Sequence, residues 1–335
     1  MNENQKFENL IKRTKAKNNL RGIMISAFST IIILIMILLS ANFFIAHTMN
    51  KQSKLQDQKL NIEKIAFSPN IFTTSQSIQS VGWTKATLTE TRIKNIDGYH
   101  IHYPKKSAQF SVSGIQLSSG NDIDVYNTGS SIIAKNNKTQ EKEPIFFSRS
   151  PSTIYKKSKK LISYTPATHE AKKLSAMNNT LAEVALTFDN SYSYDEIRKI
   201  IPDNIMINYY WLGFGNNNID TMAGVGRYIG LNASTDGRGT LIEGSSKNHN
   251  YIGYNGLKQA LTDSSSLDFE SRNLNQNYIS SIKAQLSSNL KKAKFNGVIV
   301  SGKSENLKNL DDLNFVFASN VGATTPIVPF EEPLK

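Results

Sequence analysis

The stretch LAEVALTFDNSYSYDEIRKIIPDNIMINYYWL, residues 181–212, carries the clearest structural pattern in the chain. Its two ends, residues 181–188 and 205–212, are short and mostly apolar, and runs of this length are typical of buried strands. The middle, residues 194–201, has apolar side chains at the spacing of one helix face. The stretch therefore predicts a strand, a helix and a second strand in succession.

The ends of this helix are specified locally. Ser193 and Glu196 have the S-x-x-E spacing of a capping box, in which the two side chains satisfy backbone N–H groups at the helix start. Pro202 follows the last helical residue, and proline cannot continue a helix because it lacks the N–H group. These signals predict a helix over 194–201.

A second unit of the same kind follows later in the chain. One helix is predicted from apolar side chains that share a stripe, namely Leu274, Tyr278, Ile282, Leu286 and Leu290. After it we expect a strand at 297–300, a short helix at 305–310 and a strand at 314–320. The two units predict an α+β domain over 166–330, with helices covering one face of a mixed sheet.

Residues 213–272 separate the two units and are rich in Gly, Asn and Ser. We expect this insertion to be mainly solvated loop, because such a composition favours turns. The alternative is that it carries a ligand-binding surface.

Residues 81–165 are predicted to form a β-rich exterior region. An alternating, β-branched run at 83–93 and the segment YHIHY at 99–103 are separated by an Asp-Gly pair at 97–98, which is typical of hairpin turns. Residues 47–80 are polar and are predicted to be a stalk leading into this region.

Residues 22–46 contain no charged side chain and are centred on IIILIMILL. As a helix they would be roughly 37 Å long, at about 1.5 Å per residue, which is enough to cross a bilayer. A cleaved signal peptide is the alternative, but its apolar part would be only about 7 to 15 residues long. We therefore predict one transmembrane helix at the plasma membrane.

The direction of this helix follows from the basic residues at its two ends. Residues 12–21 hold five Lys or Arg, whereas residues 47–56 hold two. Because the more basic flank stays in the cytoplasm, residues 1–21 are predicted to be a cytoplasmic basic segment and the C-terminal domain to lie outside the cell.

The cytoplasmic segment has one apolar edge. Leu10 and Ile11 lie three and four positions after Phe7, so a short helix would carry all three on one side among Lys and Arg. This edge is a candidate contact with a cytoplasmic partner. The alternative is a basic segment held at the anionic leaflet of the membrane.

The composition excludes several kinds of chemistry. The 335 residues include no cysteine, which rules out disulfides, thiolate zinc sites and cysteine nucleophiles. The net charge is +12, and most of it is spread along the exterior part, as on a solvated surface. An exterior domain without disulfides, rich in Asn, Lys and Ile, suits a Gram-positive bacterium with an AT-rich genome.

Two motifs resemble functional sites, but their context is wrong. GVIVSGKS at 297–304 has the spacing of a phosphate-binding loop, yet its Val and Ile residues are typical of a buried strand. His100 and His102 would share one face of a strand, but two ligands do not make a metal site. Without a nucleophile elbow or a paired carboxylate, and with dispersed basic residues, we predict no enzyme, no cofactor, no metal and no nucleic-acid binding.

Three stretches carry a family resemblance: residues 181–215, FNGVIVSGKSENLKNL at 295–310, and FASNVGATTPIVPF at 317–330. They resemble the C-terminal domain of the sigma factor regulator family, which are membrane-bound anti-sigma proteins of Gram-positive bacteria. The resemblance covers about residues 155–330. The apolar run and ETRIKNIDGYHIHYPKKSAQFSVSG, residues 90–114, are similar to the N-terminal part of the same family.

The resemblance implies negative control of an extracytoplasmic-function sigma factor. The inner segment, alone or with a partner membrane protein, would hold the sigma factor until an envelope signal reaches the exterior domain. Release of the partner, helix tilt and cleavage within the membrane are all compatible with the sequence. The alternative function is a non-enzymatic module that binds the cell envelope and has no transcriptional role.

Overall fold

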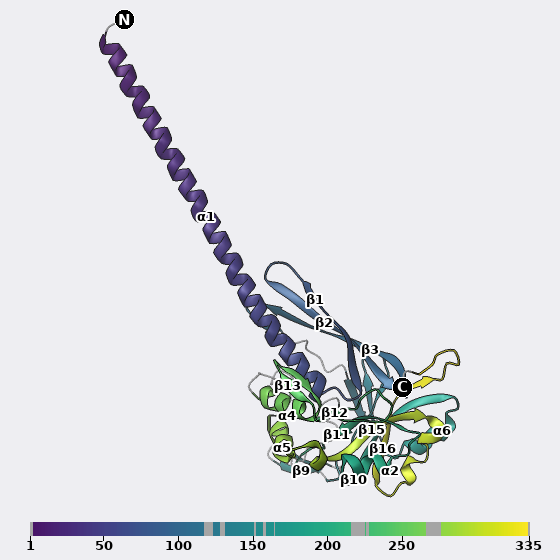
Figure 1. Ribbon diagram of the computed structural model, residues 1–335. Coiled ribbons are helices and arrows are strands. Elements are labelled where there is room, and N and C mark those ends of the chain that lie inside the picture. The colour runs from purple at the N-terminus through teal and green to yellow at the C-terminus, as the bar shows by residue number, and fades with distance from the viewer. Residues whose placement is uncertain are drawn as a thin grey trace.

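The computed structural model shows a long helix that projects from a folded body of strands and short helices (Figure 1). The structure describes the ranges 3–116, 123–127, 131–150, 152–156, 159–163, 165–215, 228–265 and 276–333, together with residue 225. It is mixed in class, with helices and sheets in the same body, so the prediction of an α+β fold is confirmed.

Helix α1 runs without a break over Glu3–Ala66. In the described part of the chain it is the one helix that is long and apolar enough to cross a membrane. The sequence predicted a stalk over 47–80, whereas residues 47–66 extend α1 and strand β1 (Ile71–Ser80) follows. Residues 47–66 contain no Gly or Pro to stop the helix, and one side of this extension packs against the body, where Gln56, Lys59, Leu60, Ile62 and Ala66 are buried.

The N-terminal sheet has the order β1-β2-β3-β4, with β2 over Lys85–Ile96, β3 over Tyr99–Ser111 and β4 over Gly114–Gln116. The predicted hairpin turn is confirmed, because Ile96 pairs with Tyr99 across two residues. Asp97 and Gly98 both have positive φ, 53° and 91°, as a tight hairpin turn of this handedness requires.

Short strands connect this sheet to the C-terminal part. They are β5 (Ile123–Asn127), β6 (Ile132–Asn136) and β7 (Lys142–Glu143), which form one small sheet, and β8 (Ser152–Lys156) and β9 (Lys159–Ser163), which form another.

The C-terminal sheet has the order β12-β11-β15-β10-β16. Its strands are β10 (Thr180–Ser193), β11 (Met206–Trp211), β12 (Gly230–Asn232), β15 (Lys294–Lys303) and β16 (Val316–Pro326). The predicted mixed sheet is wrong, since every neighbouring pair is antiparallel. The reason is topological: the strand-helix-strand connection makes β10 and β11 parallel to each other, but β15 lies between them.

Helix α2 (Tyr194–Ile200) begins at the predicted capping box, in which Ser193 and Glu196 exchange hydrogen bonds. Helix α5 covers Gln276–Gln285, and Tyr278 and Ile282 of the predicted stripe are buried there. Leu290 starts a 3-10 helix, Leu290–Lys292, while Leu274 lies outside the described residues. Two further 3-10 helices are Ala171–Ala176 and Leu310–Asp312, and α6 spans Ser304–Leu307.

The insertion between the two units is more ordered than predicted. It contains β12, a small hairpin of β13 (Ser245–Lys247) and β14 (Asn250–Ile252), and helix α4 (Gly253–Ser264). The prediction of solvated loop is wrong for these residues. Tyr254, Leu257 and Leu261 are completely buried, so the helix is stabilised by one apolar face rather than by its composition.

The main core lies on one face of the C-terminal sheet. It combines alternate side chains of β10 with α2, α4 and α5, and it also includes Ile62 and Ala66 from the end of α1. A second, aromatic cluster containing Phe146 and Trp211 covers the opposite face. The C-terminal end of the projecting helix is therefore part of the body's core.

Candidate functional site

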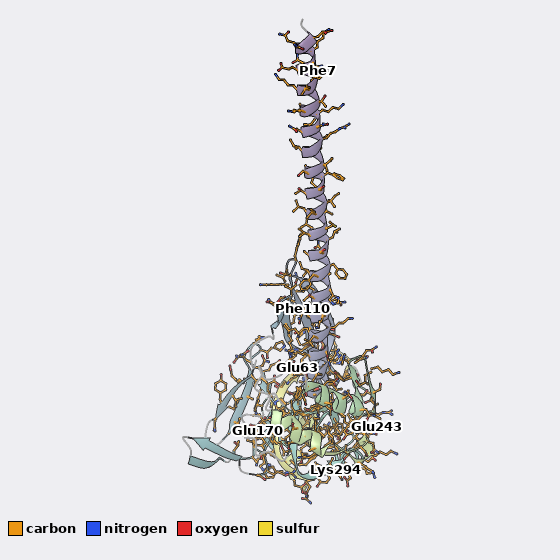
Figure 2. All side chains as sticks on the ribbon, turned by 90° about the vertical axis from the view of Figure 1, so that its left-hand side faces the viewer. Phe7, Glu63, Phe110, Glu170, Glu243 and Lys294 are labelled. Atoms are coloured by element: carbon orange, nitrogen blue, oxygen red, sulfur yellow. The ribbon has the colours of Figure 1, made fainter. Side chains whose placement is uncertain are left out.

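The predicted contact edge lies at the free end of α1. Phe7, Leu10 and Ile11 are exposed to 67%, 62% and 43%, and their spacing places them on one side of the helix. Figure 2 shows Phe7 near the tip, far from the body along the helix. The structure thus leaves the edge available, and its role in binding stays a prediction.

The other end of α1 is held firmly by the body. Gln58 donates to the hydroxyl of Tyr251, 3.3 Å away, and Glu63 forms an ion pair with Lys106 of β3. Helix α1 also packs along α4. Because these contacts come from several sides, the direction of α1 is set by how the body is packed.

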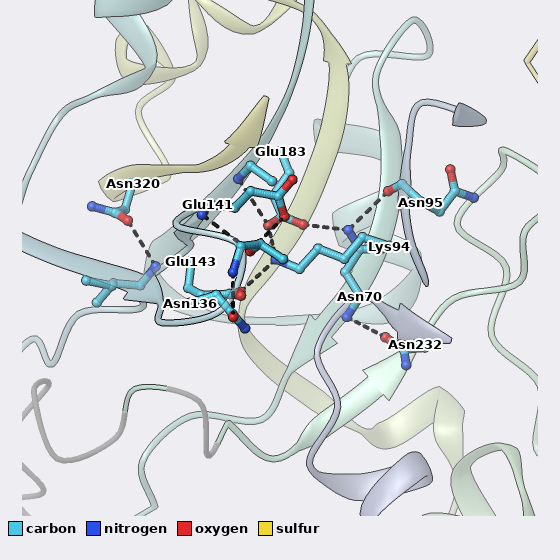
Figure 3. Close-up of polar contacts among 12 residues, drawn as sticks. Asn70, Lys94, Asn95, Asn136, Glu141, Glu143, Glu183, Asn232 and Asn320 are labelled. Carbon is cyan, nitrogen blue, oxygen red and sulfur yellow. Dashed lines mark hydrogen bonds and ion pairs between the residues drawn. The ribbon is translucent and has the colours of Figure 1, made fainter. Parts of the chain in front are cut away.

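A buried group of polar residues lies where α1, the N-terminal sheet and the C-terminal sheet meet. We call Asn70, Lys94, Glu143 and Glu183 the junction cluster (Figure 3). Lys94 Nζ is 2.7 Å from a carboxylate oxygen of Glu143 and 2.7 Å from one of Glu183. The side chain of Lys94 is 1% exposed and that of Glu183 is not exposed at all.

The three charged residues come from three different segments. Lys94 is on β2, Glu143 on β7 and Glu183 on β10. Burial by itself lowers the pKa of Lys94, but attraction to the two carboxylates outweighs burial and the net shift of its pKa is upward. The ammonium group is therefore charged at neutral pH and holds the segments together through charge-assisted hydrogen bonds.

Asn70 connects the junction cluster to α1. It follows the helix end closely and has a positive φ of 52°, which asparagine tolerates better than most residues. Its side-chain amide donates to Glu183, at 2.6 Å, and to the carbonyl of Asn95, at 3.0 Å. Its backbone N–H donates to Oδ1 of Asn232 on β12. One residue thus binds two sheets at the base of the projecting helix.

A second chain of hydrogen bonds supports the same junction. Asn208 donates to the carbonyl of Asn95, and Ser301 donates to Oδ1 of Asn208. The hairpin turn is fixed in turn, because the N–H of Asp97 donates to the hydroxyl of Ser301. Buried, connected polar networks of this kind specify one packing arrangement, since a shifted arrangement would leave charges unpaired.

Sequence reasoning missed the junction cluster, although one signal was present. Glu183 is the only charged residue in the apolar strand 181–188. A charge in a buried strand requires a partner, because an unpaired buried carboxylate is costly. The sequence does not reveal that the partner is Lys94, which is 89 residues away.

The motifs that were rejected from the sequence have ordinary structural roles. GVIVSGKS begins within β15, where Val298, Ile299 and Val300 are completely buried. His100 and His102 are both exposed on β3. Among the residues that the structure describes, no group of three or more His, Cys, Asp or Glu side chains is placed to hold a metal ion.

A polar pocket of about 290 Å³ lies at the start of the insertion. Its walls include Arg149, Ser191, Gly213 and Asn296. The guanidinium of Arg149 already donates to the carbonyl of Asp189 and to Oδ1 of Asn296, so this cation is partly satisfied by the protein itself.

Comparison with protein families gives two matches. The model described as sigma factor regulator N-terminal matches residues 8–101, and the one described as sigma factor regulator C-terminal matches residues 174–323. The chain belongs to the sigma factor regulator family. No curated protein and no solved structure matches this sigma factor regulator.

The junction cluster contains residues from both matched regions of the sigma factor regulator. Asn70 and Lys94 lie in the N-terminal match, Glu183 lies in the C-terminal match, and Glu143 lies between the two. The buried ion pairs therefore join the two family domains. Membership gives the protein an anti-sigma regulatory role and a sigma factor as its partner, and its apolar helix makes it a single-pass membrane protein.

Proposed function

We propose that this regulator holds an extracytoplasmic-function sigma factor inactive at the plasma membrane of a Gram-positive bacterium and responds to the envelope through its folded body. The observation that carries the proposal is α1 itself. One unbroken helix joins the exposed Phe7, Leu10 and Ile11 edge to side chains in the core of the body.

The proposed orientation places residues 3–21 in the cytoplasm and the body outside. Residues 12–21 hold five Lys or Arg and residues 47–56 hold two, and this bias keeps the N-terminal flank inside. The sigma factor and the Phe7 edge are then in the same compartment. The edge binds the sigma factor directly or together with a partner membrane protein.

A continuous helix also supplies a route for a signal. The end of α1 packs in the main core and is followed directly by Asn70 of the junction cluster. A change in how the two family domains pack therefore changes the tilt or rotation of α1 at its exit from the body. At the other end, tilt or rotation changes how the apolar edge is presented to its partner. No catalytic step is needed.

The test is transcription in cells that lack the chromosomal copy. Deletion is expected to raise transcription of one defined set of genes, and the wild-type chain is expected to restore repression. A chain with alanine at Phe7, Leu10 and Ile11 is expected to reach the membrane but not to repress. The matched control carries alanine on the opposite side of the helix, at Asn9 and Lys12.

The control is expected to repress as the wild type does. Unchanged transcription after deletion would contradict the sigma factor proposal and favour a module that binds the envelope. Loss of repression in both alanine variants, or repression retained in the variant of Phe7, Leu10 and Ile11, would contradict a contact specific to the apolar edge.

A further inference from the structure

The turn between β1 and β2 presents apolar side chains to solvent. Ile78, Val81 and Trp83 are exposed to 57%, 55% and 80%. We call these three residues the hairpin tip. A tryptophan is seldom so exposed without a binding role, because leaving its large apolar ring in water is unfavourable compared with burying it. The tip also carries an exposed Lys85 beside it.

The lower part of this hairpin lies beside the part of α1 near the body. Gln76 of β1 bonds to Asp57 of α1, with 3.3 Å between Nε2 and Oδ1, and Lys106 of β3 pairs with Glu63. Gln76 and Lys106 both stand opposite Glu90 in the sheet register. The level of Glu90 in the hairpin therefore corresponds to residues 57–63 of the helix.

From this level the hairpin runs toward the N-terminus of α1. Phe110 and Met49 belong to the same apolar cluster, so the sheet still contacts α1 well beyond Glu63. Figure 2 shows Phe110 on the side of Glu63 that faces Phe7, and Figure 1 shows the β1–β2 turn alongside the helix.

The distances bring the hairpin tip to the membrane surface. Trp83 lies seven positions before Glu90, five of them along β2 and the last two in the turn, so the span is at most about 23 Å at about 3.3 Å per residue. Fourteen residues of helix separate Leu60 from Ala46, the end of the apolar run, which is about 21 Å at about 1.5 Å per residue. The tip and the exit of α1 from the bilayer therefore lie at nearly the same height.

We propose that the hairpin tip is seated in the interfacial layer of the bilayer that α1 crosses. Trp83 suits this layer because its ring is apolar and its N–H group can bond to water or a headgroup. Ile78 and Val81 add apolar area, and Lys85 is close enough to meet anionic headgroups. The proposal rests on α1 crossing the membrane and is independent of the sigma factor.

Seating the tip gives the body two attachments to the membrane, α1 and the hairpin. With α1 alone, the body could tilt relative to the bilayer. With both attachments its tilt is restricted, and β2, which carries Lys94 of the junction cluster, is linked to the membrane surface. The state of the outer leaflet then acts directly on the junction.

The test uses the full chain reconstituted in vesicles of phosphatidylcholine and phosphatidylglycerol. The chain has two tryptophans, and Trp211 is buried in the body. Lipids brominated near the headgroup end of the acyl chains are expected to quench part of the tryptophan fluorescence. That part is expected to be lost in Trp83→Phe.

A matched variant keeps two tryptophans but moves the exposed one. Trp83→Phe combined with Phe330→Trp places an indole at another highly exposed position, on the body near the C-terminus. It is expected to be quenched no more than Trp83→Phe alone. Equal quenching in all three proteins, or emission from Trp83 at the wavelength of an indole in water, would overturn the proposal, because the tip would then lie in water and not in the bilayer.

Discussion

Removing the charge of Lys94 is expected to destabilise the body severely. Lys94→Met keeps most of the side-chain stem but leaves Glu143 and Glu183 buried without their cation. Breaking a buried ion pair from one side costs about 3–5 kcal/mol. Since whole domains are stable by only about 5–15 kcal/mol, this is a large fraction of the total.

The loss is expected to depend on pH, with a defined sign. Burial by itself lowers the pKa of Lys94, but the carboxylates of Glu143 and Glu183 outweigh burial, so its pKa in the folded protein lies above the unfolded value of about 10.4. The stability that this shift contributes is complete below about pH 10 and falls as the pH rises further, so the deficit of Lys94→Met is full at pH 7 and shrinks above about pH 10. The variant itself should lack this dependence, because it has no ammonium group to titrate.

Urea unfolding of the full chain in detergent micelles, followed by circular dichroism, measures the deficit. Neutralising the whole group, as Lys94→Met with Glu143→Gln and Glu183→Gln, is expected to recover most of the lost stability, because no buried charge is left unpaired. A deficit below about 1 kcal/mol at pH 7, or one that does not shrink above about pH 10, would refute the assignment of the cluster as a junction held by charge.

Three further predictions concern other parts of the molecule. Ser193→Ala removes the helix cap of α2 and is expected to cost about 1 kcal/mol in the same unfolding assay, while Ser193→Asp should cost much less; equal losses would argue against capping. Burial raises the pKa of Tyr228 above its ordinary value, so its contribution to stability is complete below about pH 10 and falls as the pH rises further, which a pH series of melting temperatures checks. Because the chain has no cysteine, Lys247→Cys on the body and Glu8→Cys on the basic segment each give a single label site, and a maleimide that cannot cross membranes is expected to label the first but not the second in intact cells; the reverse result would invert the proposed orientation.

The sequence predicted those elements whose signals are local. The capping box at Ser193 and the hairpin turn at Asp97 and Gly98 depend on residues within a few positions of each other, and both are present. The apolar run of the membrane helix is likewise a local property. These elements were identified because no distant contact was needed to recognise them.

The features that were missed depend on distant parts of the chain. Residues 47–66 are polar, and their helical structure follows from packing against the N-terminal sheet and α4. Helix α4 lies in a stretch of turn-forming composition and is stabilised by the main core. The antiparallel sheet follows from the insertion of β15 between β10 and β11, a placement that local patterns do not specify.

The candidate sites show the same contrast. The Phe7, Leu10 and Ile11 edge was predicted because it is periodic, and the structure leaves it exposed on one side of α1. The junction cluster was missed because Lys94, Glu143 and Glu183 are far apart in the sequence and each is ordinary alone. Burial and pairing, which give these residues their importance, appear only in the folded chain.

The most direct test of the proposed function is photo-cross-linking in native membranes. A photoreactive residue is placed at Leu10, on the apolar edge, and in a matched protein at Asn9, on the opposite side of the helix. Capture of a sigma factor, or of a membrane protein that itself binds one, from Leu10 and not from Asn9 is expected. Capture of lipid alone, or equal capture from both positions, would contradict the claim that α1 presents this edge to the sigma factor.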